Sequence, residues 1–281
     1  MKKVGMFDRI FDSLSLLFKN PVLFIPDILF FLVTTGLLLL FVYINNLVPN
    51  LNLGSSSLTE QITNQIQTLF SESSSIVKLV ISFVTLLIVN VVIGLTLINI
   101  RYTMIRNLLT KKKVNLKIYF ESKKYTLSLV AIKIMLFFLY AIPLIILIPF
   151  FTGLTNSSLV GGILLALLYA MFYIVFFFVY PVLYLGGTRN PFKVMKGTFG
   201  FCRRNLRYSL MTIVVVLFVS IFIGVFSSYV STNLTSLFAN ITVAWLNWIF
   251  VGLLVLFLKL IDITLSLWVK VFSFVSYKTR V

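Results

Sequence analysis

The fold is decided by the stretch RNPFKVMKGTFGFCRRNLR, residues 189–207, which carries six Lys and Arg residues and no acid, with long apolar runs on both sides. Asn190 can cap a helix whose first position is Pro191. Four apolar residues then recur on one face at near-helical spacing: Phe192, Met195, Phe199 and Cys202. We expect that face on lipid, with five cations toward water or phosphate: Lys193, Lys196, Arg203, Arg204 and Arg207. The stretch predicts an interfacial helix leading into a membrane span.

The composition is that of a polytopic membrane protein. Of 281 residues, 60% are hydrophobic and only 11% are charged, whereas soluble domains usually carry about 25% charged residues. The 24 Lys and Arg residues against 7 acids give a formal net charge of +17. In a membrane chain such an excess usually lies in cytoplasmic loops. Nucleic acid is therefore not an expected partner.

No catalytic or metal site can be assembled from the sequence. Catalysis inside a membrane needs a nucleophile with a base, a metal site or paired carboxylates. The chain has no histidine and one cysteine, and its acids never come closer in sequence than Asp8 and Asp12. An internal disulfide is excluded, and we expect no enzymatic activity, no metal and no cofactor.

Hydrophobic runs predict an all-α fold with six transmembrane helices. A bilayer needs about 20 residues, and six segments satisfy this: 22–44, 76–100, 125–151, 159–185, 208–230 and 241–265. Residues 45–75 form a long polar outer loop. Residues 266–281 form a basic amphipathic tail, expected on the inner membrane surface.

The distribution of cations predicts the orientation. Four Lys and Arg residues precede the first span, eight lie at 101–124, six at 189–207 and three in the tail, whereas the outer side has only Lys78. By the positive-inside rule both termini are cytoplasmic, in a multi-pass protein of the cell membrane. Three Asn-x-Ser/Thr triplets, at Asn156, Asn233 and Asn240, fall in or beside the outer loops. They would accept a glycan in a suitable host, although chance also produces such triplets in Asn- and Ser-rich loops.

The chain reads three times as a cytoplasmic amphipathic helix, a span, an outer connection and a second span. The units cover about 5–100, 114–185 and 190–265. Their amphipathic helices begin at Phe7, Leu116 and Phe192, and each gives way to the next span at Lys19-Asn20, Lys123-Lys124 and Arg204-Asn205. The match is one of pattern rather than of residues.

With a first helix that ends in Lys19-Asn20-Pro21 before the first span, the chain resembles the YciC-like integral membrane proteins and the membrane domain attached to some glycerophosphodiester phosphodiesterases. The soluble phosphodiesterase domain, with its acids and histidines, has no counterpart in this sequence. The resemblance implies membrane association and lipid-linked physiology, without enzymatic residues.

Three ionisable residues lie within predicted spans: Lys133, Lys259 and Asp262. Charges inside a membrane are costly and are functional candidates by default. Lys259 and Asp262 are three residues apart on a helix and can pair. Lys133 lies close enough to the inner boundary for partial snorkelling. Anchoring, a solute or proton pathway, and partner binding are the alternatives for these residues.

These patterns predict a non-enzymatic membrane protein that acts through its cytoplasmic interfacial helices. It would organise anionic lipid or dock a partner complex at the inner leaflet, and a homo-oligomer is another option. Candidate headgroup-binding residues are Lys111, Lys112 and Lys113 together with Lys193, Lys196, Arg203, Arg204 and Arg207. The alternatives are a transporter or channel for a small solute, or a subunit of a larger membrane assembly. A continuous polar cavity lined by Lys133, Lys259 or Asp262 would favour the transporter.

Overall fold

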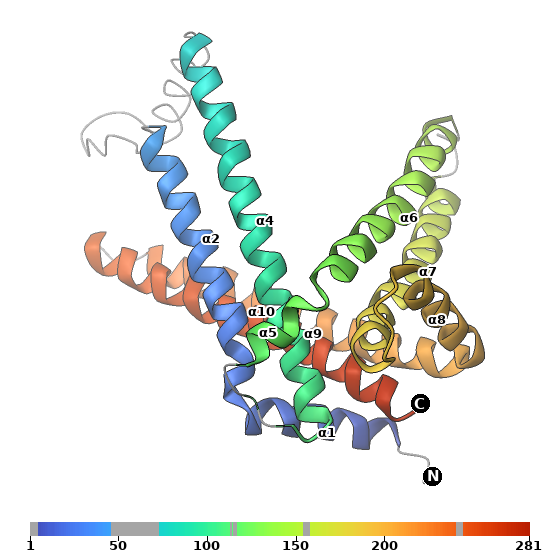
Figure 1. The fold of residues 1–281 in the computed structure, drawn as a ribbon. Helices are drawn as coiled ribbons and strands as arrows, with labels where there is room; N and C mark the ends of the chain where they lie inside the picture. The colour runs from blue at the N-terminus through green and yellow to red at the C-terminus, as the bar shows by residue number, and fades with distance from the viewer. Residues whose placement is uncertain (1–4, 46–72, 113, 115–116, 154–157, 240–243) are drawn as a thin grey trace. The chain divides into compact units, whose positions relative to one another are not determined.

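The computed structural model describes residues 5–45, 73–112, 114, 117–153, 158–239 and 244–281, and every regular element in these ranges is a helix (Figure 1). The predicted all-α class is therefore confirmed for this part of the chain. Contacts divide the chain into two compact units, described separately below: unit 1 is Met1–Ile25 with Asn99–Val281, and unit 2 is Pro26–Ile98. The first predicted hairpin thus forms unit 2 alone, whereas the second and third share unit 1 with the first amphipathic helix.

In the described part of the chain, short helical elements precede each pair of long helices. In order they are α1 Met6–Lys19, η1 Pro21–Phe24, α2 Ile25–Ile44, α4 Ser73–Leu109, α5 Ile118–Lys123, α6 Thr126–Gly153, α7 Ser158–Leu185, α8 Pro191–Arg204, α9 Leu206–Ala239 and α10 Ala244–Lys278. Most of the predicted outer loop, the residue Lys113, and the triplets at Asn156 and Asn240 lie outside the described residues.

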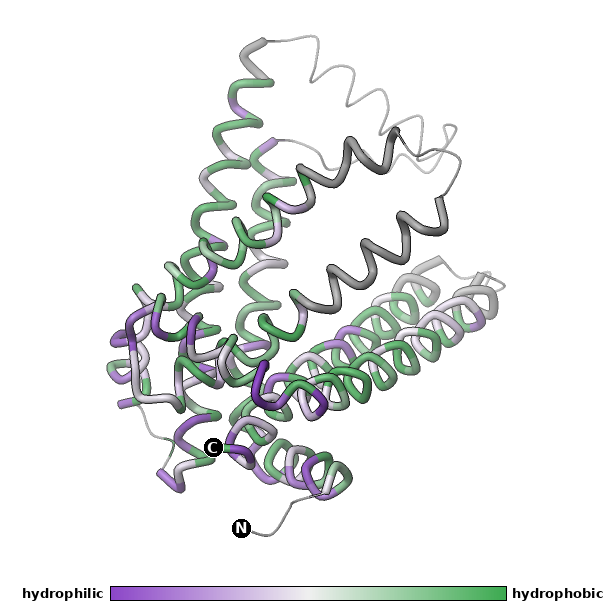
Figure 2. Tube along the Cα trace, turned by 90° about the vertical axis from the view of Figure 1, so that its right-hand side faces the viewer, coloured by the Kyte–Doolittle hydropathy of each residue, from purple (hydrophilic) through white to green (hydrophobic). Residues whose placement is uncertain are grey.

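Five helical stretches in the described residues are long and apolar enough to cross a membrane: Pro21–Ile44, Ile76–Leu109, Thr126–Pro143, Leu206–Leu234 and Ile249–Lys278. Figure 2 shows how predominantly hydrophobic the long helices are. The chain is therefore a multi-pass membrane protein. At the predicted fourth span, side chains of α7 are described from Phe172 to Leu185, an apolar stretch shorter than a span. The sixth span stays a prediction.

Hydrogen bonds between polar side chains join α4 to α2 and to Asn45, the residue that follows α2. The Thr34 hydroxyl donates to Oδ1 of Asn90 at 3.0 Å, and Nδ2 of Asn45 donates to the Ser82 hydroxyl at 2.9 Å. In hydrocarbon such bonds stabilise helix pairs, because lipid offers polar groups no alternative partner. Apolar side chains cover the outer faces and are exposed, including Leu38, Leu39, Ile81 and Val92.

The core of unit 1 is built around the C-terminal part of α10, which packs against α1, α7 and α9. The predicted interfacial tail begins within this helix, yet α10 continues unbroken to Lys278. The apolar side chains of the segment are buried, including Trp268, Val271, Phe272, Phe274 and Val275. Ser273 and Ser276 are also buried, and small hydroxyls allow this because they can return a hydrogen bond to a carbonyl of their own helix, as Ser273 does to Lys270.

Helices α1 and α8 share a length and a terminal design. Each has 14 residues and is followed by an asparagine at the C-cap, Asn20 and Asn205. In both, the asparagine Nδ2 donates to the carbonyl four residues earlier, at 2.8 Å and 3.1 Å, and so satisfies a helix-end acceptor. A buried hydroxyl, Ser13 or Thr198, lies seven residues before each asparagine. The repeat of the first and third units itself stays a prediction. Helix α5 is much shorter, with six residues.

Candidate functional site

Helix α8 begins at the predicted cap. Oδ1 of Asn190 accepts hydrogen bonds from the backbone N–H groups of Phe192 at 3.0 Å and Lys193 at 3.2 Å. Pro191 occupies the first helical position, where a missing N–H costs nothing. The predicted helix start at Pro191, with Asn190 as its cap, is therefore confirmed.

The buried face of α8 packs mainly against α7, within unit 1. Its buried residues are Val194, Met195, Thr198, Phe201 and Cys202. The sequence places Met195 and Cys202 on lipid, and the structure buries both in protein. Burial also raises the pKa of the Cys202 thiol to about 11. A helix at the edge of a bundle needs one apolar stripe for protein and another for lipid, and the sequence pattern merges the two.

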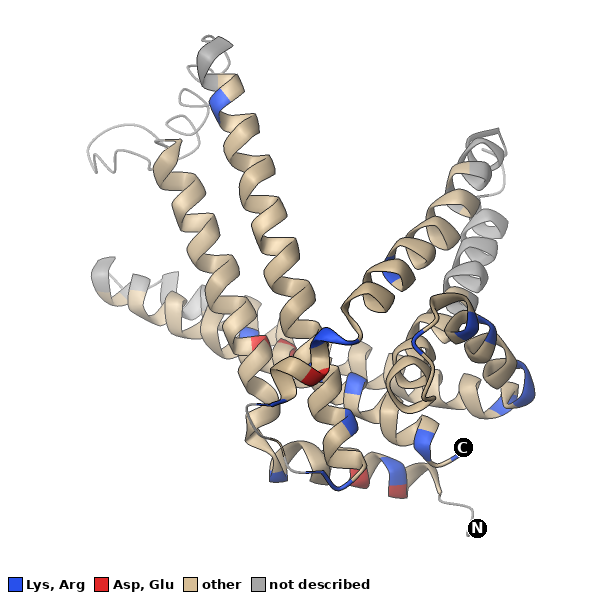
Figure 3. Cartoon of the chain, in the orientation of Figure 1, with Lys and Arg blue, Asp and Glu red and all other residues tan. Residues whose placement is uncertain are grey.

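The outer face of α8 and the first turn of α9 combine exposed cations with exposed rings. Phe192 is 72% exposed and Phe199 is 46% exposed. All five predicted cations are also exposed: Lys193, Lys196, Arg203, Arg204 and Arg207. Figure 3 marks where Lys and Arg lie along the helices. Within the described part of the chain, none of these five forms an ion pair. We call these seven residues the α8–α9 basic surface.

Helices α1 and α5 also expose aromatic side chains. Phe7, Phe11 and Phe18 of α1 are exposed, as are Tyr119 and Phe120 of α5. The Lys123 ammonium lies 4.7 Å from the centre of the Tyr119 ring, which is cation–π geometry. Helices α1, α5 and α8, each of which precedes a predicted span, thus all present exposed rings.

The predicted basic loop after α4 is described in part. Lys111 and Lys112 are exposed. Lys111 adopts a φ of 56°, a left-handed conformation that ends α4 as a C-cap residue does. Lys113 lies outside the described residues.

Arg9 is a cation whose role the sequence does not reveal. The periodicity of α1 assigns it to the water face, but the side chain is only 3% exposed. Its Nη1 donates to the hydroxyls of Thr212 at 3.2 Å and Ser276 at 3.3 Å, and its guanidinium lies 4.2 Å from the centre of the Tyr208 ring. Arg280 covers the same ring at 4.3 Å. Burial lowers the pKa of Arg9, and the side chain ties α1 to α9 and α10.

Of the three charged residues predicted within spans, the structure pairs Lys259 with Asp262 but not Lys133 with either. Lys259 donates to Oδ2 of Asp262 at 2.7 Å, which confirms the predicted pair. Lys133 lies on α6, and the like charge of Arg101 repels it. Asp262 also lines a cavity of about 250 Å³ between α4, α7, α9 and α10. Among the described residues, neither Lys133 nor Lys259 lines that cavity.

The sequence does not mark the other polar residues of the cavity as candidate site residues. Lys270 falls in the predicted tail, and Tyr102 and Tyr180 look like interfacial aromatic residues near span ends. A lysine and tyrosines near the inner ends of spans are common in membrane proteins, so only packing distinguishes these from others.

Comparisons cover protein families, curated proteins and solved structures. None of the three finds a match. The function is therefore argued from the geometry of the chain itself.

Proposed function

We propose that this protein binds anionic phospholipid at the inner leaflet through the α8–α9 basic surface. The observation that carries the proposal is a set of exposed cations, four on α8 and one on α9, together with the exposed rings of Phe192 and Phe199; the other face of α8 is buried in protein. Rings of this kind insert at the headgroup boundary, and cations beside them meet lipid phosphates. The packing of α8 against α6, α7 and α9 holds both groups at one surface of unit 1.

The proposal includes a six-span topology with both termini in the cytoplasm. In this topology the three ring-bearing helices α1, α5 and α8 all lie at the inner leaflet, where anionic lipids and the positive-inside rule place basic segments. Exposed apolar residues continue from the basic surface into α9, including Leu206, Leu210 and Met211. A lipid whose headgroup contacts Arg207 could therefore keep its acyl chains on apolar side chains.

The test is the amount of acidic phospholipid that copurifies with the protein in mild detergent. Each cation near an anionic surface contributes about 1 kcal/mol, so replacing Arg203, Arg204 and Arg207 with Gln should weaken headgroup affinity by roughly two decades. High salt should reduce retention by the wild type and have little further effect on the variant.

The matched control replaces the same three arginines with Lys. It keeps the charge and should retain most of the lipid, because the attraction is mainly electrostatic. Equal retention by the wild type and the Gln variant, with the same response to salt, would reject the proposal and leave these cations with a topological role. If the Gln variant keeps its lipid but loses a protein that copurifies with the wild type, the surface is a docking site for a partner complex.

A further inference from the structure

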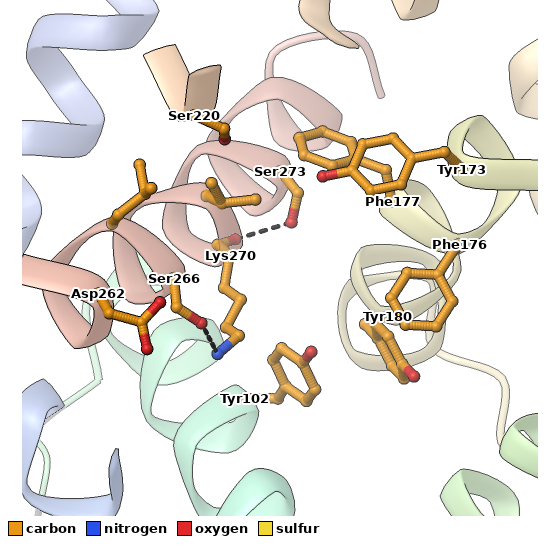
Figure 4. A pocket seen from close by; sticks show the side chains of 12 residues that line it. Tyr102, Tyr173, Phe176, Phe177, Tyr180, Ser220, Asp262, Ser266, Lys270 and Ser273 are labelled. Atoms are coloured by element: carbon orange, nitrogen blue, oxygen red, sulfur yellow. Dashed lines mark hydrogen bonds between the residues drawn. The ribbon is translucent and has the colours of Figure 1, made fainter. Parts of the chain in front are cut away.

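Helix α10 borders an apolar groove as well as the polar cavity already described. Figure 4 shows Asp262, Ser266 and Lys270 on the α10 side of the polar cavity. The groove lies along another face of α10, and only Leu265 lines both spaces. It encloses about 410 Å³, within the range of ligand pockets. Its walls are Ile10 and Leu14 of α1, Val219 and Ile223 of α9, and six residues of α10 from Phe257 to Trp268, all in unit 1.

The wall of the groove is apolar. None of the described residues that line it is charged, and Thr264 carries their one aliphatic hydroxyl. That hydroxyl donates to the Leu260 carbonyl of its own helix at 2.7 Å. The indole N–H of Trp268 donates to the Ser13 hydroxyl at 3.0 Å. The groove therefore favours an apolar occupant, because a polar one would lose its hydrogen bonds to water and find few replacements.

The surroundings of the groove identify that occupant as lipid. Helices α9 and α10 both contain stretches long and apolar enough to cross a membrane. Phe257 and Leu260 line the groove and are also exposed, so the groove is open along that edge. In a bilayer the molecules next to such an edge are acyl chains. A chain that fills the groove supplies the van der Waals contacts that an empty space lacks.

The length of the groove fits one chain from one leaflet. Between Phe257 and Trp268, α10 rises about 16 Å at about 1.5 Å per residue, and the hydrocarbon of one leaflet is about 15 Å thick. Helix α1 lies at the Trp268 end, where Ile10 and Leu14 join the wall. The exposed rings of α1 mark this end as the headgroup end.

We propose that the groove between α1, α9 and α10 holds one acyl chain of a phospholipid from the leaflet in which α1 lies. The ester end of the chain lies beside Trp268 and the methyl end points toward Phe257. Because the wall carries no charge, occupancy does not depend on salt or on headgroup charge. This separates the groove from the α8–α9 basic surface, with which it shares no residue.

The probe is phosphatidylcholine brominated on its acyl chains, and the readout is the fluorescence of Trp268. The changes Trp245→Phe and Trp248→Phe leave Trp268 as the only tryptophan of the full-length protein. Its side chain lines the groove but is only 5% exposed. Bromine quenches at contact, so a brominated chain must enter the groove to quench it. In detergent micelles, quenching should saturate as lipid is added, be stronger with bromine near the ester end than near the methyl end, and be unchanged by high salt.

The blocking variant is Thr264→Phe, which places a ring in the groove. It should raise the lipid fraction needed for half-maximal quenching about tenfold or more, because an overfilled space no longer admits a chain without strain. The matched control is Thr232→Phe on α9. That threonine is exposed, lies outside the groove and also donates to a carbonyl of its own helix, so the control should behave like its parent. Ile223→Phe blocks the α9 wall and replaces Thr264→Phe if that variant does not fold.

Three results would overturn the proposal. Quenching that rises without saturation, and equally in the blocking variant, would mean contact with bulk lipid only. Stronger quenching by bromine near the methyl end would place the chain the other way round. No quenching at any lipid ratio would mean that protein, such as a second copy of this chain, fills the groove.

The proposed function is tested separately from this groove. Gln in place of Arg203, Arg204 and Arg207 should leave the quenching of Trp268 unchanged. Thr264→Phe should keep the salt-sensitive retention of acidic phospholipid seen in the wild type. Failure of the α8–α9 proposal and failure of this one are therefore read from different measurements.

Discussion

At the scale of single residues, Arg9 shows how a buried charge can be kept without an ion pair to any described residue. Its described partners are the hydroxyls of Thr212 and Ser276, the Met6 sulfur, the Gly5 carbonyl and the ring of Tyr208. A planar guanidinium can stack on the ring and donate in its own plane at the same time. An ammonium cannot, so arginine and lysine are not equivalent here.

We predict that Arg9→Lys destabilises the protein by about 1–3 kcal/mol, the range expected when buried hydrogen bonds to a charged group are lost together with a cation–π contact. The measurement is the thermal unfolding midpoint in detergent. The matched control is Arg280→Lys, which changes an exposed arginine on the same Tyr208 ring. That variant should shift the midpoint much less, and equal shifts would show that burial of Arg9 contributes little.

At the scale of elements, α1 has three faces rather than two. Arg9, Ser13 and Leu17 are buried in unit 1, Phe7, Phe11 and Phe18 are exposed, and Asp8, Asp12 and Lys19 form a third, polar exposed face. Helix α8 repeats this division. Sequence periodicity separates polar from apolar residues but cannot tell an apolar residue that meets protein from one that meets lipid, because both are apolar surroundings.

We predict that neighbouring positions of α1 meet different solvents. A spin label at Phe11→Cys should collide mainly with oxygen dissolved in lipid, and a label at Asp12→Cys mainly with a water-soluble nickel complex. Both would be made in a Cys202→Ser background and measured in lipid bilayers. Equal exposure of both labels to the nickel complex would show that α1 does not lie in the interface.

At the scale of the whole molecule, topology decides whether the basic residues face one leaflet. Counting cations predicts that residues 101–124 and 189–207 share the cytoplasmic side with both termini. The proposed lipid surface depends on that orientation, because the inner leaflet carries the negative surface potential.

We predict that cysteines placed at Ser56 or Thr235 react with an impermeant reagent from outside intact cells, in a Cys202→Ser background. A cysteine at Lys112 should react only after permeabilisation. The reason is the excess of Lys and Arg on the predicted inner side and the single Lys78 near the outer side. The reversed labelling pattern would contradict the topology. It would place the α8–α9 basic surface at the outer leaflet, against the proposed function.

The sequence by itself determined the features that depend on neighbours a few residues away. Membrane class, the places of the long apolar helices, the Asn190 cap and the Lys259–Asp262 pair all follow from composition, hydrophobic length and helical spacing. The burial of Arg9, the position of the last turns of α10 in the core and the lining of the Lys270 cavity were decided only by tertiary structure. Each depends on which helix packs against which. Hydropathy does not encode that choice, since inside a membrane lipid and protein are equally apolar neighbours.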